Sequence, residues 1–327
     1  MRIGYTTLRL EDPDRSRPVL VDLWYPTALG AIETEHDYGM ARGQVSENAP
    51  LAEGRHALVL LSHGAFGSAR NYSWIAEHLA RSGFLVAGVS HFRESPAYGS
   101  DTIDPAFALQ PWHRVRDCSF ALGVLVAHPQ IGTHIDPGRI GALGHSSGGA
   151  TVLALGGARF DLDALVRYCV SEAARTDKGC AYASGLATVA PPSLEASSSH
   201  ADERIRAIVA LDPALGPGHD PSRVAVPTHV VGSVQNDFLP FEAHAGRYAR
   251  LIPGATLTRL ANGEGHFVFL DVCNWDREAN GVPLCRDQVG VDRAKVHERL
   301  REIIARFFDD ELRSSRATRP DGDLMRT

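Results

Sequence analysis

The sequence predicts an α/β fold in which helices flank a mostly parallel central sheet. Segments with the apolar pattern of strands alternate with segments of helical spacing, and this alternation is typical of parallel sheets covered by helices. Two segments carry the clearest pattern. Residues 56–64, HALVLLSHG, form the continuous apolar run of a buried central strand, and residues 139–157 have the pattern of a strand, a tight turn and a helix.

The other elements follow the same alternation on both sides of these segments. An early strand is expected at 18–26, where Pro26 ends an apolar run. Residues 27–55 contain glycine, proline and mixed charge, so we expect a long surface loop there. The remaining expected elements are a helix at 71–83, a strand at 84–91, a helix at 111–128, strands at 205–212, 226–233 and 255–261, a helix near 241–251 and a closing helix near 292–310.

Residues 158–203 interrupt the alternation. They contain a short helical stretch, two cysteines, two prolines and a serine-rich run, and they predict a small cap insertion over the site. A chain of 327 residues is at the upper limit for one domain. We therefore expect a single domain over residues 1–312, followed by a flexible polar tail at 313–327.

Composition excludes several classes of partner. The chain is 44% hydrophobic and 22% charged, with a net charge of −6, so it has no electrostatic reason to bind nucleic acid or an anionic membrane. It has no apolar run near the roughly 20 residues that span a bilayer, so no transmembrane segment is expected. The first residues become charged too soon for a signal peptide, which predicts a cytoplasmic protein unless a signal has been removed.

Five cysteines add a second indication of compartment. Cys169 and Cys180 form one close pair in sequence, and Cys273 and Cys285 form another, whereas Cys118 lies in an apolar helical pattern. No CxxC or His-x-x-x-His pattern accompanies them, so no zinc site is expected. Two local disulfides are expected instead, and these would indicate the periplasm or secretion. Free thiols would favour the cytoplasm.

Residues 144–148, GHSSG, match the G-x-S-x-G pattern of a nucleophile on a sharp turn between a strand and a helix. The apolar strand IGAL precedes the turn and the apolar helix ATVLAL follows it. Side chains at Gly144 and Gly148 would collide with the neighbouring strand and helix, so glycine is needed at both. The alternative is an ordinary glycine-rich turn between a strand and a helix, with no catalytic role. The context instead predicts the α/β-hydrolase fold, with Ser146 as nucleophile.

A serine nucleophile needs a general base, which in this fold follows late in the chain in the order Ser, Asp or Glu, His. His266 lies in NGEGHFVFL, a loop-like segment just after the last expected strand. Three other late histidines fit less well, because His229 lies inside a strand and His244 and His297 lie in helices. His266 is therefore the predicted base.

Two aspartates are candidates for the acid that orients this base. Asp237 follows the strand at 226–233, and Asp212 follows the preceding strand, so both stand at the same edge of the sheet. Asp237 lies in a polar turn and directly follows the strand that precedes the histidine-bearing one. Asp212 is followed by Pro213 and could be a structural cap. Asp237 is the favoured acid, and Asp212 is kept as the alternative.

The oxyanion of the reaction needs two N–H donors. One is expected to be the backbone N–H of Ser147, directly after the nucleophile. The other is expected from the glycine-rich loop after the strand at 56–64, and Ala65 N–H is the candidate. Phe66 in the same loop is a candidate for substrate binding. His63 is expected to brace the loop rather than to react.

Several stretches together resemble a known family. VDLWYPT, LSHGAFGSARNYSWIAEHLARSGFLVAGVSH, GHSSGG, ANGEGHFVFLDVC and LCRDQVGVDRAKVHERL are similar to the bacterial proteins called predicted dienelactone hydrolases, relatives of the platelet-activating-factor acetylhydrolases. The likeness covers most of residues 4–310. It implies an esterase or lipase-like enzyme with its triad on Ser146 and His266, and it leaves the acid open, since family members differ between the positions of Asp212 and Asp237. True dienelactone hydrolases have cysteine where this chain has Ser146.

The expected function is hydrolysis of short- to medium-chain acyl or acetyl esters through an acyl-enzyme, without metal or organic cofactor. The expected partner is a small-molecule or lipid-like ester substrate. Alternatives on the same triad are an amidase or peptidase, distinguished by its ratio of amide to ester turnover, and a polyester or phospholipid acyl hydrolase. An inactive binding protein would fail to react with a fluorophosphonate.

Overall fold

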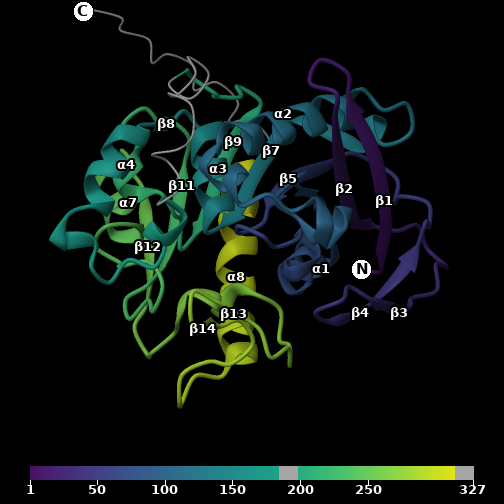
Figure 1. Ribbon diagram of the computed structural model, residues 1–327. Coiled ribbons are helices and arrows are strands. Elements are labelled where there is room, and N and C mark those ends of the chain that lie inside the picture. Colours follow the sequence, from purple (N-terminus) through teal and green to yellow (C-terminus); the bar gives the residue numbers. More distant parts are fainter. Residues whose placement is uncertain (184–197, 314–327) are drawn as a thin grey trace, which may run out of the picture.

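The computed structural model describes residues 1–183 and 198–313. Its main feature is a sheet of ten strands with the order β12-β11-β9-β7-β5-β6-β2-β1-β4-β3 (Figure 1). These strands are β1 (Ile3–Asp12), β2 (Arg17–Pro26), β3 (Thr34–Asp37), β4 (Arg42–Glu47), β5 (His56–Ser62), β6 (Leu85–Ser90), β7 (Ile135–His145), β9 (Ile205–Leu211), β11 (Thr228–Ser233) and β12 (Thr256–Leu260). The six strands from β12 to β6 pair in parallel, and β2 joins them antiparallel.

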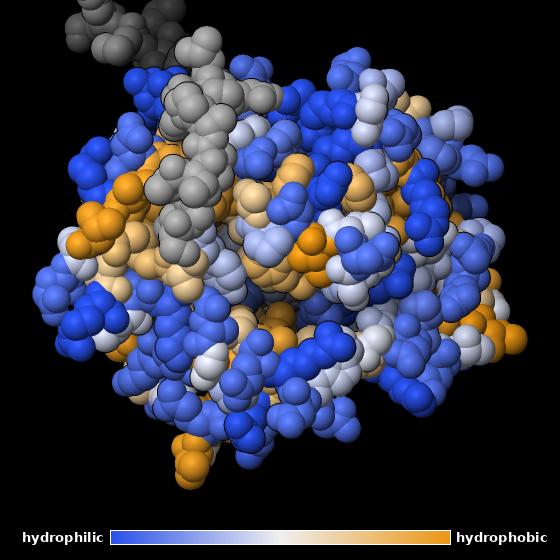
Figure 2. All heavy atoms as spheres, viewed as in Figure 1, coloured by the Kyte–Doolittle hydropathy of each residue, from blue (hydrophilic) through white to orange (hydrophobic). Residues whose placement is uncertain are grey.

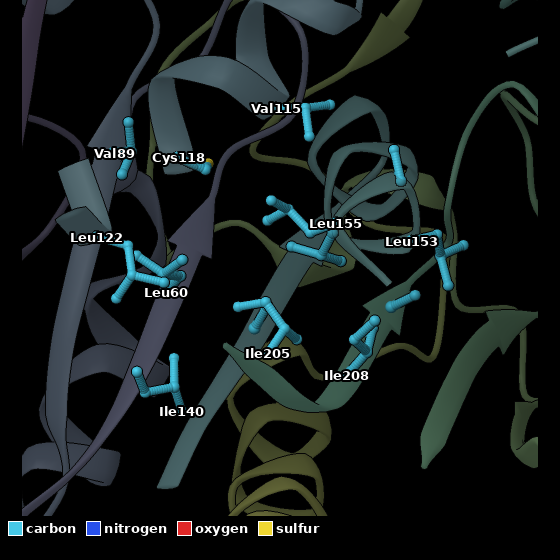
Figure 3. Packing of buried hydrophobic residues seen from close by; sticks show 14 of the residues in the cluster. Leu60, Val89, Val115, Cys118, Leu122, Ile140, Leu153, Leu155, Ile205 and Ile208 are labelled. Carbon is cyan, nitrogen blue, oxygen red and sulfur yellow. The ribbon is translucent and has the colours of Figure 1, made fainter. Parts of the chain in front are cut away.

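Helices cover both faces of this sheet and form two separate hydrophobic clusters (Figure 1). The helices are α1 (Ser73–Arg81), α2 (Trp112–Ala127), α3 (Ser147–Leu155), α4 (Leu162–Cys169), α5 (Cys180–Ala183), α7 (Ala245–Leu251) and α8 (Arg293–Leu312). On one face, α2 and α3 pack on Leu60, Ile140 and Ile208 of three neighbouring central strands (Figure 3). On the other face, α1 and α8 cover the alternate side chains of the same strands.

Helix α8 shows why the closing helix could be predicted from the sequence. Every fourth residue of α8 from Val296 to Leu312 is buried, which makes one apolar stripe along the helix. The predicted parallel sheet and its flanking helices are therefore confirmed. Each expected strand and helix is present, with ends shifted by a few residues, except that the helix expected near 241–251 is shorter and begins at Ala245.

The N-terminal third differs from the prediction. Residues 3–12 form β1, an antiparallel partner of β2, although no strand was expected there, and the expected loop at 27–55 contains β3 and β4. The prediction of a continuous surface loop is therefore wrong. These strands lie at one edge of the sheet. Every residue of β3 is polar, so a search for apolar runs passes over that strand.

Outside the main sheet, β8 (Arg159–Phe160) pairs with β10 (His219–Asp220), and β13 (Glu278–Ala279) pairs with β14 (Val282–Pro283). The expected tail beyond residue 313 and residues 184–197 of the expected cap lie outside the described residues, and the domain boundaries stay a prediction. Among the described helices, none is long and apolar enough to cross a bilayer.

Candidate active site

Ser146 occupies the sharp turn between β7 and α3. Its backbone has φ 55° and ψ −120°, a strained conformation for a residue with a side chain. A Cβ atom at Gly144 would overlap the backbone of Gly148, and one at Gly148 would overlap the Ser62 carbonyl at the end of β5. The two glycines are therefore required by close approach of the backbone, and the expected turn geometry is present.

His266 is brought to this turn by the loop after β12, where it begins a short 3-10 helix, His266–Phe269. Its Nε2 lies 3.0 Å from Ser146 Oγ, within hydrogen-bond distance. The imidazole is fully buried, and the Phe238 ring stacks on it at 5.1 Å between ring centroids. Burial lowers the pKa of His266 to about 3, so the ring is neutral at neutral pH and Nε2 can accept the serine proton.

The two candidate acids take different positions around this histidine. Asp212 Oδ2 lies 3.8 Å from His266 Nδ1, facing the ring. Asp237 Oδ1 instead accepts the backbone N–H of His266 at 2.9 Å. Asp212 therefore faces the imidazole, whereas Asp237 holds the backbone of the loop that carries it, which differs from the expectation that favoured Asp237.

Asp212 is held firmly in this orientation. Its Oδ1 accepts the Ser233 N–H at 2.8 Å, and its backbone has φ 37°, in the left-handed region. The carboxylate is 2% exposed, and burial raises its pKa to about 7 while the Ser233 hydrogen bonds act in the opposite direction. The gap of 3.8 Å between Asp212 Oδ2 and His266 Nδ1 is longer than a hydrogen bond.

Asn236 is a site residue that the sequence analysis did not single out. Its Oδ1 accepts the backbone N–H groups of Phe238 and Leu239, which fixes the amide so that Nδ2 points at Asp212 and His266. Nδ2 donates to Asp212 Oδ2 at 2.8 Å and lies 3.3 Å from His266 Nδ1. In the sequence, the only indication that Asn236 belongs to the site was its position in the same turn as Asp237.

The predicted oxyanion residues lie together at a cavity of about 700 Å³ that also contains Ser146 and His266. Ala65, Phe66 and Ser147 all line it, and Phe66 has φ 57°. Its walls combine apolar and polar side chains, and the face shown in Figure 2 is hollowed near its centre, just above β13 and β14. A volume of this size is typical of small-molecule sites.

The other histidines considered as bases have structural contacts. The His229 ring bonds to two threonines of β12, and His297 stacks on Trp74 with its Nε2 2.8 Å from the Val268 carbonyl. His244 lies at the start of α7 and pairs with Asp177 at the cavity wall, at 2.7 Å. Among the described residues, no cluster of three histidine, cysteine or acidic groups could hold a metal ion.

Two disulfides close loops beside the cavity. Cys169 bonds to Cys180 and Cys273 bonds to Cys285, as expected, whereas Cys118 is a buried free thiol. Residues from both loops line the cavity, among them Tyr182 just after the first loop and Trp275 within the second. The loops touch, because Asn280 Nδ2 donates to the Lys178 carbonyl at 3.1 Å. The disulfides therefore brace two walls of the cavity.

The chain is similar to several known proteins. The chain is 29% identical over 119 residues to cutinase 2 of Thermobifida cellulosilytica, covering 36% of this chain and 40% of that one. It is 29% identical over 206 residues to platelet-activating factor acetylhydrolase of Cavia porcellus (46% and 47%), and 27% identical over 142 residues to bis(hydroxyethyl) terephthalate hydrolase of Streptomyces coelicolor (43% and 42%). The chain thus spans less than half the length of each of these curated relatives, all of which are named as ester hydrolases.

A solved ferulic acid esterase from Streptomyces cinnamoneus shares the fold, with a TM-score of 0.64 and 21% identity over 98% of this chain and 94% of that one. The predicted α/β-hydrolase fold and the predicted relation to platelet-activating-factor acetylhydrolase are thereby confirmed. The likeness to proteins called dienelactone hydrolases stays a prediction. A family model described as chlorophyllase matches residues 25–201, more than half of the sequence. The chain belongs to the chlorophyllase family.

Proposed function

We propose that this protein is a serine hydrolase of carboxylic esters, with Ser146 as the nucleophile and His266 as its general base. One observation carries the proposal. The Oγ of a strained Ser146 lies 3.0 Å from Nε2 of a neutral, buried His266, and both residues line a cavity large enough for a small ester.

In this mechanism Ser146 Oγ attacks the ester carbonyl while His266 Nε2 accepts its proton. The N–H groups of Ala65 and Ser147 stabilise the oxyanion of the tetrahedral intermediate. His266 then protonates the leaving alcohol, and water hydrolyses the acyl-enzyme by the same steps in reverse. This chemistry needs no metal or organic cofactor.

We assign the acid to Asp212 and not to Asp237. A buried imidazole that must become cationic during the reaction needs a nearby anion, and the Asp212 carboxylate faces Nδ1 of the ring. Asp237 supports the same step indirectly, because its bond to the His266 N–H fixes the loop.

We propose short- to medium-chain acyl or acetyl esters as substrates, whether small molecules or lipid-like. The limited volume of the cavity and its mixture of apolar and polar lining residues support this substrate class. We also propose that residues 1–312 form a single domain with a cap insertion at 158–203, which contributes Leu165 and Tyr182 to the cavity wall. Phe66 lies 5.5 Å from Tyr182 between ring centroids, so it is our candidate for contact with the substrate. Amides, polyesters and phospholipids are the alternative substrates on the same residues.

The test compares Ser146→Ala with Ser147→Ala on a panel of p-nitrophenyl esters, together with fluorophosphonate labelling. Ser146→Ala should lower kcat by a factor on the order of 10⁴ or more and abolish labelling. Ser147→Ala is the matched control, since only its backbone N–H is used, and it should have a mild effect. Turnover close to wild type in Ser146→Ala would disprove the proposal. An amide-to-ester turnover ratio near one would favour the amidase alternative.

A further inference from the structure

A buried tyrosine and a buried histidine connect three parts of the site. Tyr72 Oη accepts the backbone N–H of Gly64 at 3.0 Å and lies 2.8 Å from His145 Nδ1. His145 Nε2 in turn lies 3.0 Å from the backbone carbonyl of His266. Tyr72 is 1% exposed and His145 is 2% exposed. The chain of contacts therefore runs inside the protein from the oxyanion loop, past the residue before the nucleophile, to the loop of the general base.

The partners allow one arrangement of protons along this chain. A carbonyl oxygen only accepts, so His145 Nε2 must carry the hydrogen that it donates to His266. Burial lowers the pKa of His145 well below its ordinary value, so the ring is neutral and its Nδ1 is an acceptor. The Tyr72 hydroxyl then donates to Nδ1 while its oxygen accepts the Gly64 N–H. Each hydrogen has one acceptor, and one tautomer of His145 fits.

The same contacts orient the oxyanion loop. The His63 carbonyl accepts from the Arg114 guanidinium, and the Gly64 N–H of the same peptide donates to Tyr72, so this peptide is held at both ends. The Gly64 carbonyl is 2.6 Å from His63 Nδ1 and accepts the N–H of Gly67 at 3.2 Å. Because a trans peptide points its carbonyl and N–H in opposite directions, the N–H of Ala65 is turned away from these partners.

We propose that Tyr72 and His145 are positioning residues that hold the oxyanion loop and the general-base loop in fixed relation to Ser146. His145 directly precedes the nucleophile, so its two bonds connect the nucleophile turn to both loops at once. The inference rests on the proposed ester hydrolysis. Both side chains line the cavity, and the inference assigns them a role in orienting the reacting groups rather than in the reaction itself.

The experiment compares Tyr72→Phe, His145→Leu and the double variant with wild type on a p-nitrophenyl ester. Removal of one oxyanion donor costs about 10²–10³ in kcat, so a loop that loses its orientation should lower kcat by roughly 10- to 100-fold while KM changes less than about threefold. Because the two residues act through one chain of bonds, the double variant should lose no more than about the worse single variant.

Tyr25→Phe is the matched control. Tyr25 is a buried tyrosine whose Oη donates to the Ala49 carbonyl at 2.8 Å, outside the cavity. This variant should keep wild-type kcat with a Tm decrease comparable to that of Tyr72→Phe. An unchanged kcat in Tyr72→Phe, or losses that simply multiply in the double variant, would overturn the positioning role.

A second measurement uses wild-type protein alone, so it does not depend on a variant that folds. Nitrogen-15 NMR of the histidine rings should show the hydrogen of His145 on Nε2, and a hydrogen on Nδ1 would contradict the arrangement.

The proposed function and the positioning role can be disproved separately. A wild-type protein that neither turns over esters nor labels at Ser146 removes the proposed function, and the inference with it. An active wild type beside an equally active Tyr72→Phe removes only the inference.

Discussion

Exchanging each candidate acid for its amide tests which carboxylate supports the general base. In Asp212→Asn the side chain keeps its size and loses its charge beside a ring that becomes cationic in the transition state. At the observed 3.8 Å between Asp212 Oδ2 and His266 Nδ1, an effective dielectric constant of roughly 20 gives an attraction of about 4 kcal/mol. Since about 1.4 kcal/mol is a factor of ten, kcat should fall on the order of 10³-fold.

Asp237→Asn should cost far less. An amide oxygen can still accept the His266 N–H that Asp237 Oδ1 now accepts at 2.9 Å, so the loop keeps its tether. We expect a loss of up to about tenfold, close to the net value of one charge-assisted hydrogen bond. Both variants are assayed with p-nitrophenyl butyrate after circular dichroism has shown that they fold.

The pH profile gives an independent measure of the same assignment. Burial raises the pKa of Asp212 to about 7, so its anion is present above that pH and lost below it. The kcat of wild type should therefore decrease as the pH falls through about 7, and Asp212→Asn should lack this limb. The variants are best compared near pH 8.5, where Asp212 is ionised. A larger loss in Asp237→Asn than in Asp212→Asn would refute the reasoning and restore the assignment to Asp237.

Three further outcomes can be measured directly. Replacing both Cys273 and Cys285 with serine opens a loop with a sequence separation of 12 and should lower the free energy of unfolding by roughly 2–3 kcal/mol in urea titrations, whereas an unchanged midpoint would show that the disulfide contributes nothing. Stability should fall between pH 6.5 and 4, because burial lowers the pKa of His219 and of His297 to about 3, and the unfolded chain then binds more protons over that range. The lowered pKa of His266, about 3, adds to this trend, whereas the raised pKa values of Asp212, about 7, and Asp271, about 6, oppose it. A protein equally stable in urea at pH 7 and pH 4.5 would contradict the prediction. Turnover of p-nitrophenyl esters should peak at short acyl chains without activation by an interface, and a preference for emulsified long-chain triglyceride would count against the proposed substrate class.

The sharp turn at Ser146 could be predicted because its requirements are local. Two glycines spaced four apart are needed wherever a strand reverses into a helix this sharply, and the collisions of added Cβ atoms at Gly144 and Gly148 confirm that requirement. The apolar stripe of α8 is local in the same sense, since it depends only on helical spacing. The polar edge strand β3 has no such pattern, because its neighbour on the sheet supplies the contacts that hold it.

Order along the chain could not show which of the two aspartates faces the imidazole of His266. Asp212 and Asp237 follow neighbouring parallel strands, so the sheet brings both carboxylates to one edge, within reach of one histidine. What separates them is the conformation of each turn. A left-handed backbone at Asp212 aims its carboxylate at the ring, whereas the turn at Asp237 aims it at a backbone N–H. Such torsions have no signature in composition or spacing when the residue is not glycine.

Orientation of the reacting groups is a separate requirement from their proximity. Parallel strands bring the loop after β5, the turn at Ser146 and the loop that carries His266 to one edge of the sheet, but the loops after the strands could still turn in several directions. Buried polar side chains remove that freedom, because a neutral hydroxyl or imidazole inside the protein costs free energy unless its hydrogen bonds are made. Tyr72 and His145 contact each other, but their other hydrogen bonds, with the Gly64 N–H and the His266 carbonyl, are made only when both loops are in place. The contact between Tyr72 and His145 joins residues 73 positions apart in sequence, and the contact between His145 and His266 joins residues 121 positions apart. Spacing along the sequence therefore gave no sign of these contacts. Substitution of these two buried residues should therefore reduce catalysis more than substitution of exposed residues at the rim of the cavity.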